Sequence, residues 1–94
     1  MQLLPYNKNM KNVEIYTGPV CIFCDWAKAL LEKKGVPFKE IYIGDDQKKM
    51  EEMIKKANGL RTVPQIFIDG QHIGGNDKLQ ALERKGKLNS ILGI

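Results

Sequence analysis

Apolar residues recur along the first half of the chain at two spacings, every second residue and every third or fourth. Residues 13–17 alternate apolar and polar types, and residues 38–43 do so more loosely, which predicts a strand in each segment. Between them, residues 23–34 carry apolar side chains at helical spacing, and Gly35 supplies a stop signal for that helix. The first half of the chain therefore predicts a strand–helix–strand unit.

The second half predicts a shorter helix followed by a hairpin and two more helical segments. The predicted elements are a helix over 47–57 capped by Asp46, strands over 63–68 and 71–73, a helix that Asn76 or Asp77 caps and that runs to Lys85, and a last helical turn over 88–92. Asp69-Gly70 is a strong signal for a tight hairpin.

The order β-α-β-α-β-β-α restricts the fold. A strand–helix–strand start implies a right-handed parallel crossover, and the hairpin adds antiparallel strands. We therefore expect an α/β domain over residues 13–94, with a four-stranded mixed sheet and helices on both faces. The apolar patch of residues 1–12 is too short for a signal peptide, and we expect these residues to form a flexible tail. Met10 could itself be an initiator.

Composition narrows the function classes. The chain has 94 residues and a net charge of +4, with 28% charged and 43% hydrophobic residues, as expected for one small globular domain. The basic residues are spread along the chain and form no nucleic-acid-reading motif, so they predict a solvated surface. No apolar run reaches the length of a membrane span. We therefore expect neither nucleic acid nor a membrane as a partner.

The cysteines carry the strongest chemical signal. Cys21 and Cys24 are the only two, and His72 is the only histidine, so a four-ligand zinc site lacks ligands. A close pair in a small chain indicates redox chemistry in a reducing compartment, and we expect the cytoplasm. The alternative is two small buried hydrophobic residues that fall close together by chance.

The position of the pair at a predicted strand-to-helix junction favours redox chemistry. Unpaired N–H groups at a helix N-terminus, together with the helix dipole, stabilise a thiolate at Cys21. Cys24, one helical turn further on, is placed to attack a mixed disulfide formed at Cys21. The sequence thus predicts Cys21 as the nucleophile and Cys24 as the resolving cysteine.

Two further segments are candidate binding loops. In residues 62–64 (Thr-Val-Pro), a cis Val63–Pro64 bond would leave the Val63 backbone free to pair with an extended substrate, although a strand-initiating proline explains the same residues. In residues 74–77 (Gly-Gly-Asn-Asp), the glycines would let a ligand approach the backbone at a helix start, although a plain turn and cap also fit.

Together these motifs, in this order and spacing, resemble the glutaredoxin family from about Val13 to Leu92. The resemblance implies a thioredoxin-like fold, and glutathione as the reducing cosubstrate, carried as a mixed disulfide on Cys21. It also implies the residues that would bind glutathione: Phe23 beside the groove, Thr62, Val63 and Pro64 along it, and Gly75, Asn76 and Asp77 at the γ-glutamyl end.

Several positions depart from the family pattern. Ile22 stands where proline is common, Gly18 where lysine is frequent, and residues 25–26 (Asp-Trp) where basic residues are usual. Arg61 is the expected replacement contact for a glutathione carboxylate, with Lys48 or Lys49 behind it. Trp26 is either a surface aromatic or part of a partner contact.

We therefore expect a monomeric, glutathione-dependent thiol–disulfide oxidoreductase that acts on protein disulfides and on glutathionylated proteins. One alternative is a glutathione-independent electron donor, for example to ribonucleotide reductase. A second is a dimer that holds a [2Fe–2S] cluster through Cys21 and glutathione.

Overall fold

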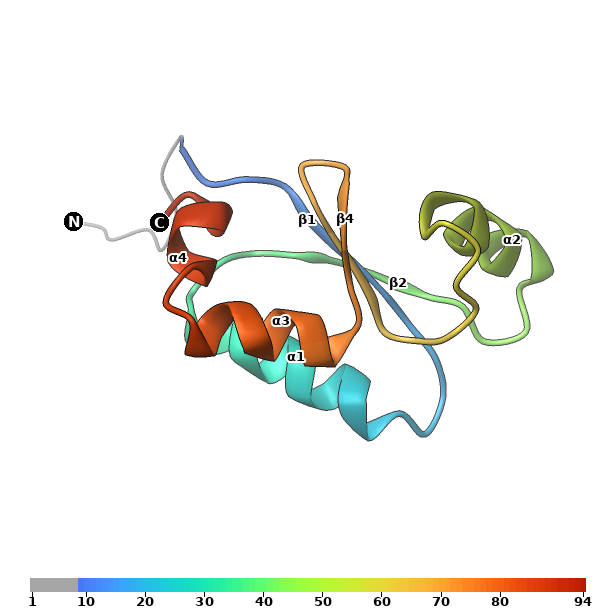
Figure 1. The fold of residues 1–94 in the computed structure, drawn as a ribbon. Helices are drawn as coiled ribbons and strands as arrows, with labels where there is room; N and C mark the ends of the chain where they lie inside the picture. Colours follow the sequence, from blue (N-terminus) through green and yellow to red (C-terminus); the bar gives the residue numbers. More distant parts are fainter. Residues whose placement is uncertain (1–8) are drawn as a thin grey trace.

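The structure is a computed structural model that describes residues 9–94. Its elements are β1 (Val13–Thr17), α1 (Ile22–Lys33), β2 (Lys39–Tyr42), α2 (Gln47–Lys56), β3 (Gln65–Ile68), β4 (Gln71–Gly74), α3 (Asn76–Arg84) and α4 (Leu88–Leu92). All the predicted helices and strands are present, with ends that differ by at most two residues (Figure 1). β3 begins later than predicted because Pro64 has no N–H to contribute to a ladder.

Two predicted helix caps had different outcomes. Asp46 caps α2 as predicted, since its side chain accepts a hydrogen bond from the Lys49 N–H at 3.1 Å. The prediction that Asn76 or Asp77 caps α3 was wrong: Gly75 is the N-cap residue, without a side-chain hydrogen bond. Asn76 is instead the first helical residue, and its buried side chain accepts from Gln80 Nε2, one turn further on.

The sheet has the strand order β2-β1-β3-β4. β1 and β2 are parallel, as the crossover through α1 requires, and the β1–β3 and β3–β4 pairs are antiparallel. The mixed four-stranded sheet is therefore confirmed. Because β3 runs against β1, the end of β1, the start of β3 and the end of β4 all lie at one end of the sheet.

The two faces of the sheet are buried by different helices. Val13, Ile15 and Ile66 pack with apolar residues of α1, α3 and α4 on one face. Tyr16 and Phe67 point the opposite way and pack against α2. This follows from strand geometry, since successive side chains point to opposite faces. Figure 1 shows α1 and α3 side by side beneath the sheet, with α2 set apart from them.

The predicted tail of residues 1–12 is only partly described, because residues 1–8 lie outside the described part of the chain. The Lys11 N–H donates to the Leu92 carbonyl at 3.1 Å, and the Asn12 N–H donates to Asp69 Oδ1 at 3.0 Å. Residues 11 and 12 are thus hydrogen-bonded to α4 and to the β3–β4 hairpin.

Candidate active site

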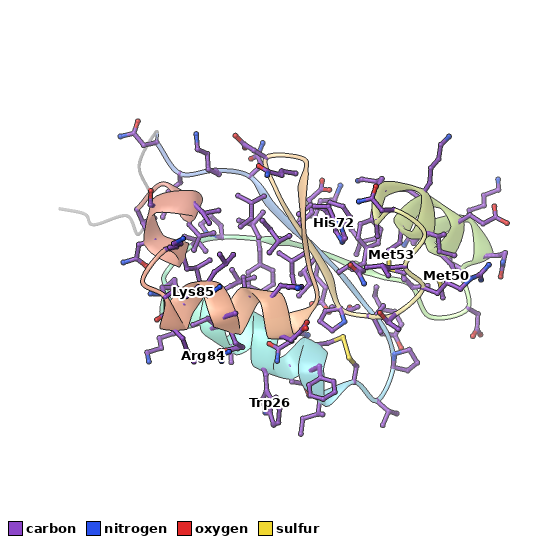
Figure 2. The ribbon with its side chains drawn as sticks, viewed as in Figure 1. Trp26, Met50, Met53, His72, Arg84 and Lys85 are labelled. Atoms are coloured by element: carbon purple, nitrogen blue, oxygen red, sulfur yellow. A yellow bond between two sulfur atoms is a disulfide. The ribbon has the colours of Figure 1, made fainter. Side chains whose placement is uncertain are left out.

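The two cysteines lie where β1 leads into α1. Cys21 is the N-cap residue of α1, and Cys24 lies in its first turn. They form a disulfide bond with a Cα–Cα distance of 5.2 Å, drawn in yellow in Figure 2. Val20, just before them, has φ +46°, an unfavourable backbone conformation for a β-branched residue, and its side chain is fully exposed. The redox-active pair is therefore held at an abrupt turn between strand and helix.

Burial distinguishes the two sulfur atoms. Cys24 is 2% exposed, whereas Cys21 is partly exposed at the surface. The Cys24 N–H donates to Cys21 Sγ at 3.1 Å. Hydrogen-bond donors and the helix dipole at this position favour the thiolate form of a cysteine. The geometry thus makes Cys21 the sulfur that a substrate can reach.

The loop before β3 faces this sulfur. Cys21 Sγ lies 3.8 Å from the Val63 carbonyl oxygen, and the Val63–Pro64 peptide bond is cis. Among the described residues, none accepts a hydrogen bond from the Val63 N–H. A Cβ atom at Gly18 would lie 3.2 Å from Val63 Cγ2. Gly18 therefore permits the close approach of the two loops at a position where the family frequently has lysine.

A cavity of about 330 Å³ opens beside the disulfide. Its lining residues come from α1, from the loop before β3 and from the start of α3: Phe23, Thr62, Val63, Pro64, Gly75, Asn76 and Asp77. These are the seven positions, other than Arg61, at which the sequence predicted glutathione contacts. Arg61, Lys48 and Lys49 are exposed, and none of them lines this cavity. The structure therefore brings three distant segments together and leaves the predicted cations outside.

Sequence reasoning missed the residues that anchor this loop. Gln65 is 1% exposed, and its Nε2 donates to the Thr62 carbonyl at 3.0 Å and to Thr62 Oγ1 at 3.3 Å. Its Oε1 lies 2.7 Å from His72 Nε2. A polar residue inside an otherwise apolar strand was the available signal, since buried polar groups need partners. His72 lies on β4, within the strand predicted over 71–73, and supports Gln65.

The titratable groups with clearly shifted pKa values lie outside this cavity. Burial raises the pKa of Tyr16, whose hydroxyl is hydrogen-bonded to Glu52 and to Lys56. The hydrogen bond to Tyr16 raises the pKa of Lys56. A hydrogen bond from Thr17 lowers the pKa of Glu40. These groups join β1 to α2 and β2, so their role is structural.

Exposed apolar residues surround the dithiol. Ile22, Phe23 and Trp26 on α1 are each more than half exposed. Phe23 and Trp26 form an edge-to-face pair with ring centroids 5.5 Å apart. Figure 2 shows Trp26 projecting from α1 away from the sheet. These three residues thus form an apolar patch at the start of α1, next to the exposed Asp25, and the patch meets the cavity at Phe23.

The described part of the chain contains neither a metal centre nor a membrane-spanning helix. Within residues 9–94, no group of three or more His, Cys, Asp or Glu side chains is arranged to hold a metal ion. An iron–sulfur cluster at Cys21 would therefore need ligands from outside this chain. No helix in the same residues is long and apolar enough to cross a membrane.

Comparisons with known proteins agree with the geometry. The glutaredoxin family model matches residues 13–73. Glutaredoxin 3 of Escherichia coli is 57% identical over 83 residues, which cover 88% of this chain and 99% of that protein. The solution structure of a glutaredoxin from Brucella melitensis is 45% identical, with a TM-score of 0.80 and coverage of 94% of this chain and 95% of that one.

A more distant neighbour contains a ligand. The crystal structure of a buckwheat glutaredoxin–glutathione complex is 30% identical to this chain, with a TM-score of 0.76 and coverage of 89% of this chain and 78% of that one. These likenesses confirm the thioredoxin-like fold expected from the sequence. Family and dithiol together give a thiol–disulfide redox function. The chain belongs to the glutaredoxin family.

Proposed function

We propose that the protein is a glutathione-dependent oxidoreductase that reduces protein disulfides and glutathione mixed disulfides, with Cys21 as the nucleophile. The observation that carries the proposal is the 330 Å³ cavity beside Cys21, formed by segments far apart in the sequence. A reducing compartment such as the cytoplasm fits a protein whose working form is the dithiol. We expect the protein to act as a monomer.

The cavity suits the parts of glutathione. The Val63 N–H and carbonyl are available to pair with the cysteinyl backbone, as an added strand pairs with a sheet edge. The N-terminus of α3 offers N–H groups to the γ-glutamyl carboxylate, and the Asp77 carboxylate can hold the ammonium group beside it. A Cβ at Gly75 would lie 3.4 Å from the Pro64 oxygen, so glycine keeps this end open. The buckwheat relative, solved with glutathione, supports this choice of cosubstrate.

A glutathione mixed disulfide requires only Cys21. The Cys21 thiolate attacks the glutathione sulfur of the mixed disulfide. The S–S bond to the substrate protein breaks, and the cysteine of the substrate protein leaves as a thiolate and takes a proton from solvent. A second glutathione thiolate then attacks the glutathione sulfur on Cys21. This releases glutathione disulfide and restores the Cys21 thiolate, which the Cys24 N–H and the helix dipole stabilise.

A protein disulfide requires both cysteines. Cys21 attacks one substrate sulfur, the substrate S–S bond breaks, and the other substrate sulfur leaves as a thiolate that takes a proton from solvent. The Cys24 thiolate then attacks Cys21 Sγ in the mixed disulfide. The second substrate thiol leaves, so two electrons have passed from the dithiol to the substrate. The product is the Cys21–Cys24 disulfide observed in the structure. Two glutathione molecules return the disulfide to the dithiol.

Two serine variants test these roles. We expect Cys21→Ser to abolish all exchange, because no other thiol is exposed. We expect Cys24→Ser to reduce glutathionylated substrates still, while losing most protein-disulfide reduction. The measurement is NADPH consumption with glutathione and glutathione reductase. Equal loss in both variants on a glutathionylated substrate would contradict the assignment.

The choice of electron source tests glutathione dependence. Wild-type protein is assayed on one disulfide substrate, either with glutathione and glutathione reductase or with thioredoxin reductase. Turnover in the first system is the expected result. Turnover only in the second would establish instead the glutathione-independent electron donor considered from the sequence.

A further inference from the structure

A second hollow lies next to the cavity. It is a groove of about 600 Å³ between the helices α1 and α3. Trp26, Leu30 and Lys33 contribute from α1, and Arg84 lies on the α3 side. The spacings along α1 place these side chains on one face of that helix. The groove therefore runs along both helices rather than into the core.

The groove adjoins the proposed glutathione site. Asn76 and Asp77 line both hollows. The Phe23–Trp26 aromatic pair makes a second connection, because Phe23 lines the cavity and Trp26 lines the groove. The groove therefore begins next to the active site, and a substrate segment that extends from Cys21 past Phe23 and Trp26 would reach it.

The charge along the groove changes from one end to the other. Asp77 lies at the end near the dithiol, and Lys33 and Arg84 lie in the last turns of α1 and α3, at the far end. Among the described residues, neither cation has a carboxylate partner, whereas the neighbouring Lys34 is paired with Glu83. Figure 2 shows Arg84 on α3 beyond Trp26, away from the disulfide. The far end of the groove is therefore suited to an anion.

We propose that this groove binds a segment of a disulfide-containing protein substrate, with apolar residues at Trp26 and an acidic side chain between Lys33 and Arg84. The inference rests on the proposed action of the dithiol on protein disulfides. The inference specifies the class of substrate. The protein substrate should have an extended segment with an acidic residue at a fixed distance from its reactive cysteine.

Helix geometry gives that distance. Lys33 is twelve positions beyond Cys21, which is about 18 Å at the helical rise of about 1.5 Å per residue. An extended chain covers about 3.3 Å per residue. The acidic residue should therefore lie about five residues from the substrate cysteine. Acidic residues next to the cysteine should not help, because Asp77 lies at that end.

The test compares two peptides, each with two cysteines joined by an internal disulfide. The Glu peptide has glutamate five residues before the first cysteine and five residues after the second, and the Gln peptide has glutamine at the same positions. The pre-reduced protein is mixed with excess peptide and peptide reduction is followed in a single turnover, so glutathione is not needed. The proteins are wild type, Lys33→Gln/Arg84→Gln, and a control, Lys85→Gln/Lys87→Gln, which removes the same charge from residues that do not line the groove.

We expect wild type to half-saturate at about three- to tenfold lower concentration of the Glu peptide than of the Gln peptide, the range for two partly exposed ion pairs. The maximal rate should be equal for both peptides. Lys33→Gln/Arg84→Gln should lose the preference and the control should keep it. No preference in wild type, its persistence in Lys33→Gln/Arg84→Gln, or equal loss in the control would overturn the proposal.

Two further measurements separate peptide binding in the groove from a failure of catalysis and from self-association. Turnover of a small glutathione mixed disulfide should be the same in all three proteins, and its absence in wild type would refute the proposed function instead. Sedimentation at assay concentration should give a monomer. A wild-type dimer that Lys33→Gln/Arg84→Gln dissociates would assign the groove to a second copy of the chain and overturn the peptide proposal.

Discussion

Replacement of His72 by phenylalanine should reveal how the active-site loop is anchored. Gln65 Oε1 is a carbonyl oxygen that can only accept, so the hydrogen of its bond with the histidine is on His72 Nε2. Nε2 therefore donates to Gln65 Oε1 at 2.7 Å. In His72→Phe the ring can still pack against Phe67, with which His72 has a centroid distance of 5.1 Å, but the donor is lost.

The size of the effect follows from burial. Gln65 is 1% exposed, so water cannot replace the missing donor without opening the sheet. Leaving a buried acceptor unsatisfied costs about 1–3 kcal/mol. We therefore expect His72→Phe to lower the free energy of unfolding by about 1–3 kcal/mol. For a chain of this size, each kcal/mol corresponds to a fall in melting temperature of about 4–8 °C.

Urea unfolding of a double-mutant cycle measures this coupling. In His72→Phe/Gln65→Leu both partners are apolar, so the double variant should cost clearly less than the sum of the single variants, by about 1 kcal/mol. Gln71→Phe, at an exposed position of the same strand, is the matched control and should change stability little. Strict additivity, or an unchanged midpoint in His72→Phe, would refute the reasoning.

Two other changes test separate parts of the structure. Because Thr17 and Lys28 hold the pKa of Glu40 below 4.5, the ionised form is favoured in the folded state, and that stabilisation is lost as pH falls through the folded pKa. The stability difference between wild type and Glu40→Gln, measured by urea unfolding, should shrink below pH 4.5; a constant difference would contradict this. Gly75→Ala should raise the KM for a glutathione mixed disulfide, because its methyl group would lie 3.3 Å from Asp77 Oδ1. The free energy of unfolding of Gly75→Ala should fall by less than about 1 kcal/mol. An unchanged KM would exclude glutathione from that end of the cavity.

Local sequence determined the secondary structure. Gly35 and the Asp69-Gly70 pair have positive φ angles where the pattern predicted a helix end and a hairpin. Alternation over residues 13–17 predicted β1 itself, and in the structure Val13 and Ile15 face one layer and Tyr16 the other, because a strand has a period of two. The cap of α3 was mispredicted because Asn76 is buried and hydrogen-bonded within the helix, which depends on tertiary packing.

The sequence by itself also indicated thiol–disulfide redox chemistry, since a dithiol lies at a predicted strand-to-helix junction, and it predicts Cys21 as the attacking sulfur. Only the tertiary structure showed that residues 62–64 and 75–77 share one cavity with Phe23, because antiparallel pairing of β3 with β1 brings distant loops to one end of the sheet. The same packing left Arg61 outside that cavity and paired buried Gln65 with His72. Such contacts join residues far apart along the chain or on opposite sides of a turn, so local pattern and spacing do not specify them.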